Sequence, residues 1–104
     1  MKTLQGVKMK ALKLMADYQC FPLWQASTNA VGNVDPQSLP ISLALQNRLL
    51  SWAEKFDATL NADDPARSGF LNESAASEFR AEGEMLVRCL QDELGSVYAI
   101  VKKL

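Results

Sequence analysis

The sequence predicts a single α+β domain in which a small sheet of two to three strands packs against a two-helix hairpin. Three observations predict this fold. Two segments have apolar residues at helical spacing, strand-like segments stand near both chain ends, and 104 residues suit one domain. We expect the order strand, long loop or strand, helix, helix, strand, and an antiparallel or mixed sheet. The domain spans residues 1–104, with residues 1–9 as a loosely ordered leader.

The first predicted helix begins at Pro40 and ends near Asn61. Proline suits the first turn of a helix because its missing N–H group is not needed there, and Ser38 is the expected cap. The apolar positions step by 4, 3, 4 and 4 residues, which places them on one helix face. They are Leu45, Leu49, Trp52, Phe56 and Leu60.

The second predicted helix starts at a cap, Asn72 or Ser74, and ends at Gly95, because glycine tolerates the αL conformation. Its apolar stripe repeats the steps of the first: Phe79, Gly83, Leu86, Leu90 and Leu94. A glycine inside a helix costs about 1 kcal/mol relative to alanine. We therefore expect Gly83 to permit the close approach of a bulky neighbour such as Trp52.

The strands are predicted at the two ends of the chain. Residues 97–101 (VYAIV) form the clearest strand, since β-branched and aromatic residues favour strands. Residues 10–16 (KALKLMA) indicate a second strand with imperfect alternation. Because a two-stranded sheet is marginally stable, we expect a third strand within residues 24–34, or a sheet edge that a partner completes.

The composition excludes several classes of enzyme. The chain has no histidine, which removes the Ser-His-Asp triad and most zinc sites. It also has no GxGxxG, P-loop or EF-hand sequence. We therefore expect no catalytic residues, no metal ion and no cofactor.

One alternative function is a small metal-dependent hydrolase. Asp57, Asp63 and Asp64 are its candidate ligands, because clustered carboxylates bind divalent cations. Asp63-Asp64-Pro65 is also an ordinary sequence for the loop after a helix, and we favour that interpretation.

The cysteines and the apolar segments indicate a cytoplasmic protein. Cys20 and Cys89 fit neither a CxxC nor a zinc spacing, so we expect free thiols in a reducing compartment, with Cys89 in the core. Lys8, Lys10 and Lys13 interrupt the apolar runs of the N-terminus, which argues against a signal peptide. No apolar run approaches the roughly 20 residues of a membrane span.

Charge is distributed unevenly along the chain, although the net charge is −1. Residues 17–94 contain all 12 acidic residues and five basic ones, which is a net charge of −7. A nucleic-acid-binding protein has the opposite excess, whereas an acidic body suits a basic protein partner. A merely solvated surface is the alternative. Glu78 and Glu82, a like-charge pair at i, i+4 spacing, leave the same two interpretations open, and we favour the solvated face.

Three aromatic residues, Tyr18, Phe21 and Trp24, cluster in the first long loop. Aromatic side chains in loops either anchor an interface or cover the core of a small domain. We expect Phe21 and Trp24 to cover the core, and Tyr18, beside Asp17, to lie at the surface.

Almost all of the chain beyond Met9 resembles a family of small bacterial proteins. The segments that carry the resemblance are 14–24 (LMADYQCFPLW), 32–36 (GNVDP), 39–42 (LPIS), 52–57 (WAEKFD), 60–65 (LNADDP), 68–70 (SGF), 82–83 (EG) and 93–95 (ELG). The chain is similar to the immunity proteins of contact-dependent growth-inhibition (CDI) systems.

This resemblance implies a cytoplasmic protein, monomeric or weakly dimeric, that binds a toxin domain and occludes its active site. Many such toxins are nucleases, including ones that cleave tRNA. The implied partner-binding residues are acidic side chains, which would meet the Lys and Arg of a nuclease, and two aromatic anchors. They are Asp17, Asp35, Glu54, Asp57, Asp63 and Asp64, with Tyr18 and Trp24. A structural or adaptor subunit that pairs through an exposed sheet edge remains a further alternative.

Overall fold

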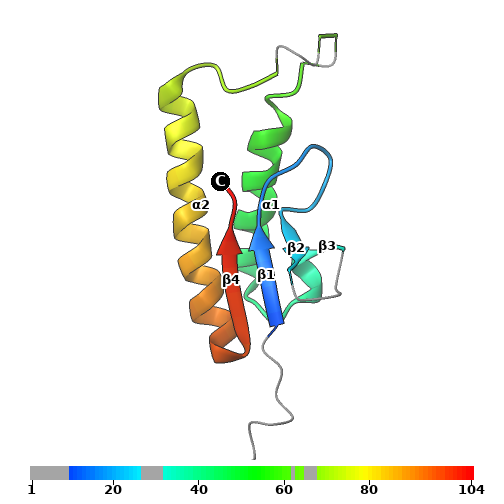
Figure 1. Ribbon diagram of the computed structural model, residues 1–104, viewed down its shortest axis with the longest axis vertical. Coiled ribbons are helices and arrows are strands. Elements are labelled where there is room, and N and C mark those ends of the chain that lie inside the picture. The colour runs from blue at the N-terminus through cyan, green and yellow to red at the C-terminus, as the bar shows by residue number, and fades with distance from the viewer. Residues whose placement is uncertain (1–9, 27–31, 62, 65–67) are drawn as a thin grey trace, which may run out of the picture.

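The computed structural model describes residues 10–26, 32–61, 63–64 and 68–104 (Figure 1). The expected leader, residues 1–9, lies outside these residues. The predicted α+β class is confirmed, because one mixed sheet packs with one face against two helices. Figure 1 shows the helices running antiparallel to each other as a hairpin.

The sheet has four strands in the order β3-β2-β1-β4. They are β1 (Lys10–Leu14), β2 (Leu23–Gln25), β3 (Asn33–Val34) and β4 (Tyr98–Lys102). The β1–β4 pair is parallel, and the β1–β2 and β2–β3 pairs are antiparallel. The predicted count of two to three strands was wrong. Strands β2 and β3 have three and two residues, which is too short for an alternating pattern to be recognised.

Helix α1 (Leu43–Asp57) begins later than the sequence predicts. Its cap is Ser42, whose side chain accepts a hydrogen bond from the backbone N–H three residues on. The predictions that Pro40 opens this helix and that Ser38 caps it were therefore wrong. Ser38 belongs instead to a separate 3-10 helix, η2 (Pro36–Ser38).

A contact from the second helix holds the start of α1 in place. The carboxylate of Glu93 accepts hydrogen bonds from the Ser42 backbone N–H at 2.6 Å and from its hydroxyl at 2.8 Å. Both groups of Ser42 are thus bonded by a residue that lies far away in sequence. Local sequence signals do not reveal such a contact, which explains the misplaced boundary.

Helix α2 (Glu73–Leu94) agrees closely with its sequence pattern. Asn72, one of the two expected caps, accepts a hydrogen bond from the Ala75 backbone N–H at 2.8 Å. The five positions of the predicted stripe are all buried. The helix ends at Gly95 as expected. The backbone of Gly95 has φ of 74° and ψ of −161°, so it is not in the expected αL region but in another region that is essentially restricted to glycine. A short 3-10 helix, η4 (Gly95–Val97), then leads into β4.

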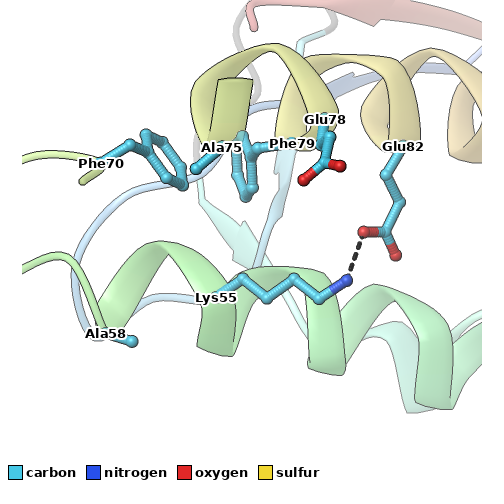
Figure 2. Close-up of a pocket in the computed structure, with 7 residues that line it drawn as sticks. All are labelled: Lys55, Ala58, Phe70, Ala75, Glu78, Phe79 and Glu82. Atoms are coloured by element: carbon cyan, nitrogen blue, oxygen red, sulfur yellow. Dashed lines mark hydrogen bonds and ion pairs between the residues drawn. The ribbon is translucent and has the colours of Figure 1, made fainter. Parts of the chain in front are cut away.

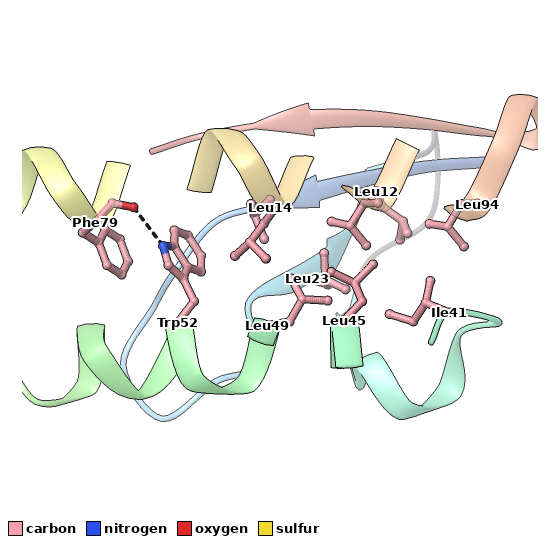
Figure 3. Close-up of a cluster of buried hydrophobic side chains, with 11 residues drawn as sticks. Leu12, Leu14, Leu23, Ile41, Leu45, Leu49, Trp52, Phe79 and Leu94 are labelled. Carbon is pink, nitrogen blue, oxygen red and sulfur yellow. Dashed lines mark hydrogen bonds between the residues drawn. The ribbon is translucent and has the colours of Figure 1, made fainter. Parts of the chain in front are cut away.

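The core lies between the sheet and the two helices (Figure 3). Alternate residues of β1 and one residue of β2 point into it, and the stripes of α1 and α2 cover them from the other side. The fully buried leucines are Leu14, Leu23, Leu49, Leu86 and Leu90. Leu60 and Phe56, at the end of the first predicted stripe, are only half-buried.

Trp52 is the largest fully buried side chain, and it joins the two helices. Its ring stacks on Phe79 of α2 with centroids 4.3 Å apart, and its Nε1–H donates to the Phe79 carbonyl at 2.9 Å. A Cβ added to Gly83 would lie 3.0 Å from Cζ2 of Trp52 and 2.8 Å from Cδ2 of Leu104. The predicted close approach of Trp52 to Gly83 is thus confirmed.

The outer edge of β4 is covered in part by a side chain of the protein itself. The side-chain nitrogen of Gln91 donates to the Tyr98 carbonyl at 2.6 Å and to the Gly95 carbonyl at 3.1 Å. The side-chain oxygen of Gln91 accepts a hydrogen bond from the Ile100 backbone N–H at 3.3 Å. The amide thus satisfies backbone groups that a neighbouring strand would otherwise bond. A partner that paired with this edge would have to displace Gln91.

Substituting Gly83→Ala should lower the free energy of unfolding by about 1 kcal/mol. Alanine gains about 1 kcal/mol of helix propensity, but overpacking against the fixed Trp52 ring costs typically about 1–3 kcal/mol. Urea denaturation followed by far-ultraviolet circular dichroism measures the difference. A higher urea midpoint than that of the wild-type protein would contradict the packing account.

Substituting Gln91→Ala should destabilise the protein by about 1 kcal/mol, since it leaves backbone groups of β4 without their partner. The uncovered edge should also promote self-association at high concentration. Denaturation and sedimentation equilibrium measure the two effects. Gln37→Ala, at an exposed position in η2, is the control, and equal behaviour of the two variants would contradict the proposed role of Gln91.

Candidate functional site

Six of the eight residues expected to bind a partner lie toward one end of the molecule. This end is formed by the β1–β2 loop, the C-terminal part of α1 and the loop that follows α1 (Figure 1). We call these six residues the acidic end: Asp17, Tyr18, Glu54, Asp57, Asp63 and Asp64.

The β1–β2 loop is held against α1 by specific contacts. The ring of Tyr18 stacks on Phe56 with centroids 4.5 Å apart, and its hydroxyl lies 3.1 Å from Oγ1 of Thr59. The carboxylate of Asp57 accepts the backbone N–H of Gln19 at 2.8 Å. Gln19 has a φ of 60°, a conformation in which non-glycine residues carry strain, so this hydrogen bond stabilises an unfavourable backbone conformation.

Glu54 and Asp57 also line a hollow of about 310 Å³ between this loop and α1. Phe21 stands at the hollow with 39% of its surface exposed, so the prediction that it covers the core was wrong. The Asn33 side chain bonds both the N–H and the carbonyl of Phe21, at 2.8 and 2.6 Å. Pro22 and Leu23, which follow Phe21, take the buried positions instead.

Asp63 and Asp64 lie in the loop after α1, and both are exposed. Their backbone N–H groups donate to the side-chain oxygen of Asn61 at 3.1 and 3.0 Å. This arrangement is the ordinary turn chemistry that the sequence indicated as one interpretation. Within the ranges that the structure describes, no three His, Cys, Asp or Glu side chains are grouped to hold a metal ion.

The remaining two expected residues lie elsewhere. Asp35 caps η2, where its carboxylate accepts the Gln37 N–H at 2.9 Å. Trp24 follows the buried Leu23 in β2 and therefore points to the opposite face of the sheet, the one that the helices do not cover. Trp24 is half-buried there, and its Nε1–H donates to the Met15 carbonyl at 2.9 Å. The prediction that Trp24 covers the core was therefore wrong.

A groove between α1 and α2 lies beside the acidic end, and the sequence pattern did not predict it. We call it the helix groove; it has a volume of about 350 Å³ (Figure 2). Its principal lining residues are Lys55, Ala58, Phe70, Glu78, Phe79 and Glu82. The like-charge spacing of Glu78 and Glu82 was the one signal of this groove in the sequence.

The described ion pairs use carboxylates outside the acidic end. Arg80 pairs with Glu73 at 2.7 Å, Lys55 pairs with Glu82 at 2.6 Å, and Lys102 pairs with Glu84. Among the described residues, Asp17, Glu54, Asp57 and Asp63 form no ion pair with Lys or Arg. These four carboxylates are therefore not balanced by a described Lys or Arg, which favours a cationic partner.

Two further observations bear on the chain as a whole. The two cysteines are free thiols, and each is partly buried, with Cys89 packed against the core. In the part of the chain that the structure describes, no helix has the length and apolar character needed to cross a membrane.

The comparisons with known proteins identify the family. No curated protein matches the chain. A family model described as Serratia CdiI immunity protein-like matches residues 10–102, which run from the first residue of β1 to the last residue of β4. Since this match covers nearly the whole chain, the protein belongs to the Serratia CdiI immunity protein-like family.

Proposed function

We propose that this protein binds and neutralises a cognate toxin domain that is a basic nuclease, such as an RNase or tRNase, and that the acidic end occludes the nuclease active site. The family supports a toxin as the partner. The observation that carries the finer proposal is the uncompensated charge of the acidic end, where four described carboxylates form no ion pair. In this proposal the protein acts in the cytoplasm as a stoichiometric inhibitor.

The physical basis is substitution of one anion for another. A nuclease holds RNA phosphates with Lys and Arg side chains, and carboxylates presented on a complementary surface occupy the same cations. Opposite potentials on the two proteins also accelerate their encounter. Such a protein needs neither a catalytic group nor a cofactor, and it does not contact the nucleic acid itself.

The contacts inside the acidic end make it a prepared surface. The Tyr18–Phe56 stack and the Asp57–Gln19 hydrogen bond hold the β1–β2 loop before any partner arrives. A loop that is already ordered loses less conformational entropy on binding, which improves affinity. Trp24 and Asp35 lie on other surfaces, and the proposed contact set does not include them.

The direct experiment is co-expression of the tagged protein with the products of the neighbouring open reading frames. We expect it to recover a basic toxin domain in a 1:1 complex whose nuclease activity is absent and returns when the inhibitor is removed. A complex that retains full nuclease activity would contradict occlusion. Recovery of the protein alone, with no toxic neighbour, would contradict the proposed function.

Substituting Asp63→Lys should slow association with the toxin domain by about threefold or more, because charges near an interface act mainly on the association rate. The effect should shrink as salt is raised. Stopped-flow fluorescence at two salt concentrations measures both. Asp92→Lys is the matched control, since Asp92 is also exposed and unpaired among the described residues but lies near the other end of α2. Equal rates for the two variants would remove Asp63 from the contact surface.

A further inference from the structure

The floor of the helix groove is aromatic. The rings of Phe70 and Phe79 lie with centroids 4.9 Å apart, and Phe79 in turn stacks on the fully buried Trp52. Phe70 comes from the loop before α2, whereas Phe79 belongs to the helix itself. The floor is therefore anchored in the core, and it offers an apolar surface without further rearrangement.

The charges of the groove do not balance. Glu78 and Glu82 lie one turn apart on α2, and Figure 2 shows both side chains descending from α2 toward α1, with Lys55 reaching up from α1. Lys55 pairs with Glu82 at 2.6 Å, while Glu78 has no hydrogen bond or ion pair with any described residue. Two carboxylates and one ammonium leave a net charge of −1 beside the aromatic rings, so the complementary occupant is a cation with an apolar stem.

We propose that the helix groove receives an arginine side chain of the toxin, whose guanidinium bonds Glu78 and approaches Glu82 while its stem packs across Phe70. The guanidinium is a planar fork of donors that can bond two carboxylates at once, and it stacks on aromatic rings, which an ammonium does less well. Arginine is also enriched among the few residues that contribute most to interfaces. A phosphate would be repelled by the two carboxylates, which argues against nucleic acid as the occupant.

This inference rests on the proposed function and extends the contact surface from the acidic end onto the helices. The two surfaces flank the same C-terminal end of α1, where Glu54 and Asp57 face the hollow beside the β1–β2 loop and Lys55 and the cap residue Ala58 line the groove beside α2. A single toxin surface can thus contact both. In this arrangement the acidic end provides electrostatic attraction, and the helix groove provides a defined position for one side chain.

The test is Glu78→Gln, which removes the charge and keeps the shape. Since Glu78 is exposed and unpaired in the described structure, the variant should fold with an unchanged melting temperature. We expect its Kd for the co-purified toxin domain to rise about tenfold, the size typical of a lost hydrogen bond to a charged group. Asp92→Asn, the same change at an exposed position near the other end of α2, should change Kd less than twofold.

A double-mutant cycle then identifies the occupant. Each arginine of the toxin domain is replaced by glutamine and measured against both wild-type protein and Glu78→Gln. One arginine should show strong coupling, so that its replacement has almost no further effect in the Glu78→Gln background. If the wild-type protein binds the toxin domain but Glu78→Gln binds equally well, or if no arginine couples to Glu78, the groove proposal is overturned and the proposed function stands. If the wild-type protein binds no toxin domain, the proposed function itself fails.

Discussion

The structure depends above all on the way Trp52 fixes one helix against the other. Its ring stacks on Phe79 at 4.3 Å, its Nε1–H bonds the Phe79 carbonyl, and its Cζ2 would lie only 3.0 Å from a Cβ at position 83. These three constraints act at one point of the hairpin and set how closely α1 and α2 approach. The open helix groove exists because the helices are held at this spacing, and its floor is the same Phe79 ring that Trp52 supports. A single buried side chain thus links the stability of the core to the shape of the exposed surface.

Ion pairs and hydrogen bonds hold some carboxylates of the domain, and others have no ion pair among the described residues. On the sheet face that the helices do not cover, Lys13 lies in register with Trp24 and Val101. Near the C-terminal end of α2, Glu93 is bonded to the start of α1, and in the middle of α2 Glu84 pairs with Lys102. Among the described residues, the carboxylates without an ion pair include Asp17, Glu54, Asp57 and Asp63 of the acidic end, Glu78, and Asp92 near the other end of α2. The carboxylates at the end where the helices meet their connecting loop are those that the proposed function assigns to a cationic partner.

The sequence predicted what depends on local pattern and missed what depends on distant contacts. The stripe of α2 and its Asn72 cap were evident because they follow helical periodicity and capping chemistry. The start of α1 was misplaced because Glu93 holds it from across the domain. Strands β2 and β3 were not distinguished, since their few residues are stabilised by neighbouring strands rather than by propensity. The acidic residues of the site were named from the family resemblance, but the Asp57–Gln19 bond that holds the β1–β2 loop against α1, and the part that Phe70 plays in the groove, required the tertiary fold.

Hydrogen–deuterium exchange of the protein with and without its toxin domain tests most directly whether the partner binds at the loop-bearing end of the helices. The account predicts slower exchange on binding in residues 54–60 and 70–82, which contain the end of α1 and the wall of the helix groove. Residues 10–14 and 98–102, in the two parallel strands, should exchange at unchanged rates. Slower exchange only in the strands, with unchanged exchange at the ends of the helices, would contradict binding of the toxin domain at the loop-bearing end.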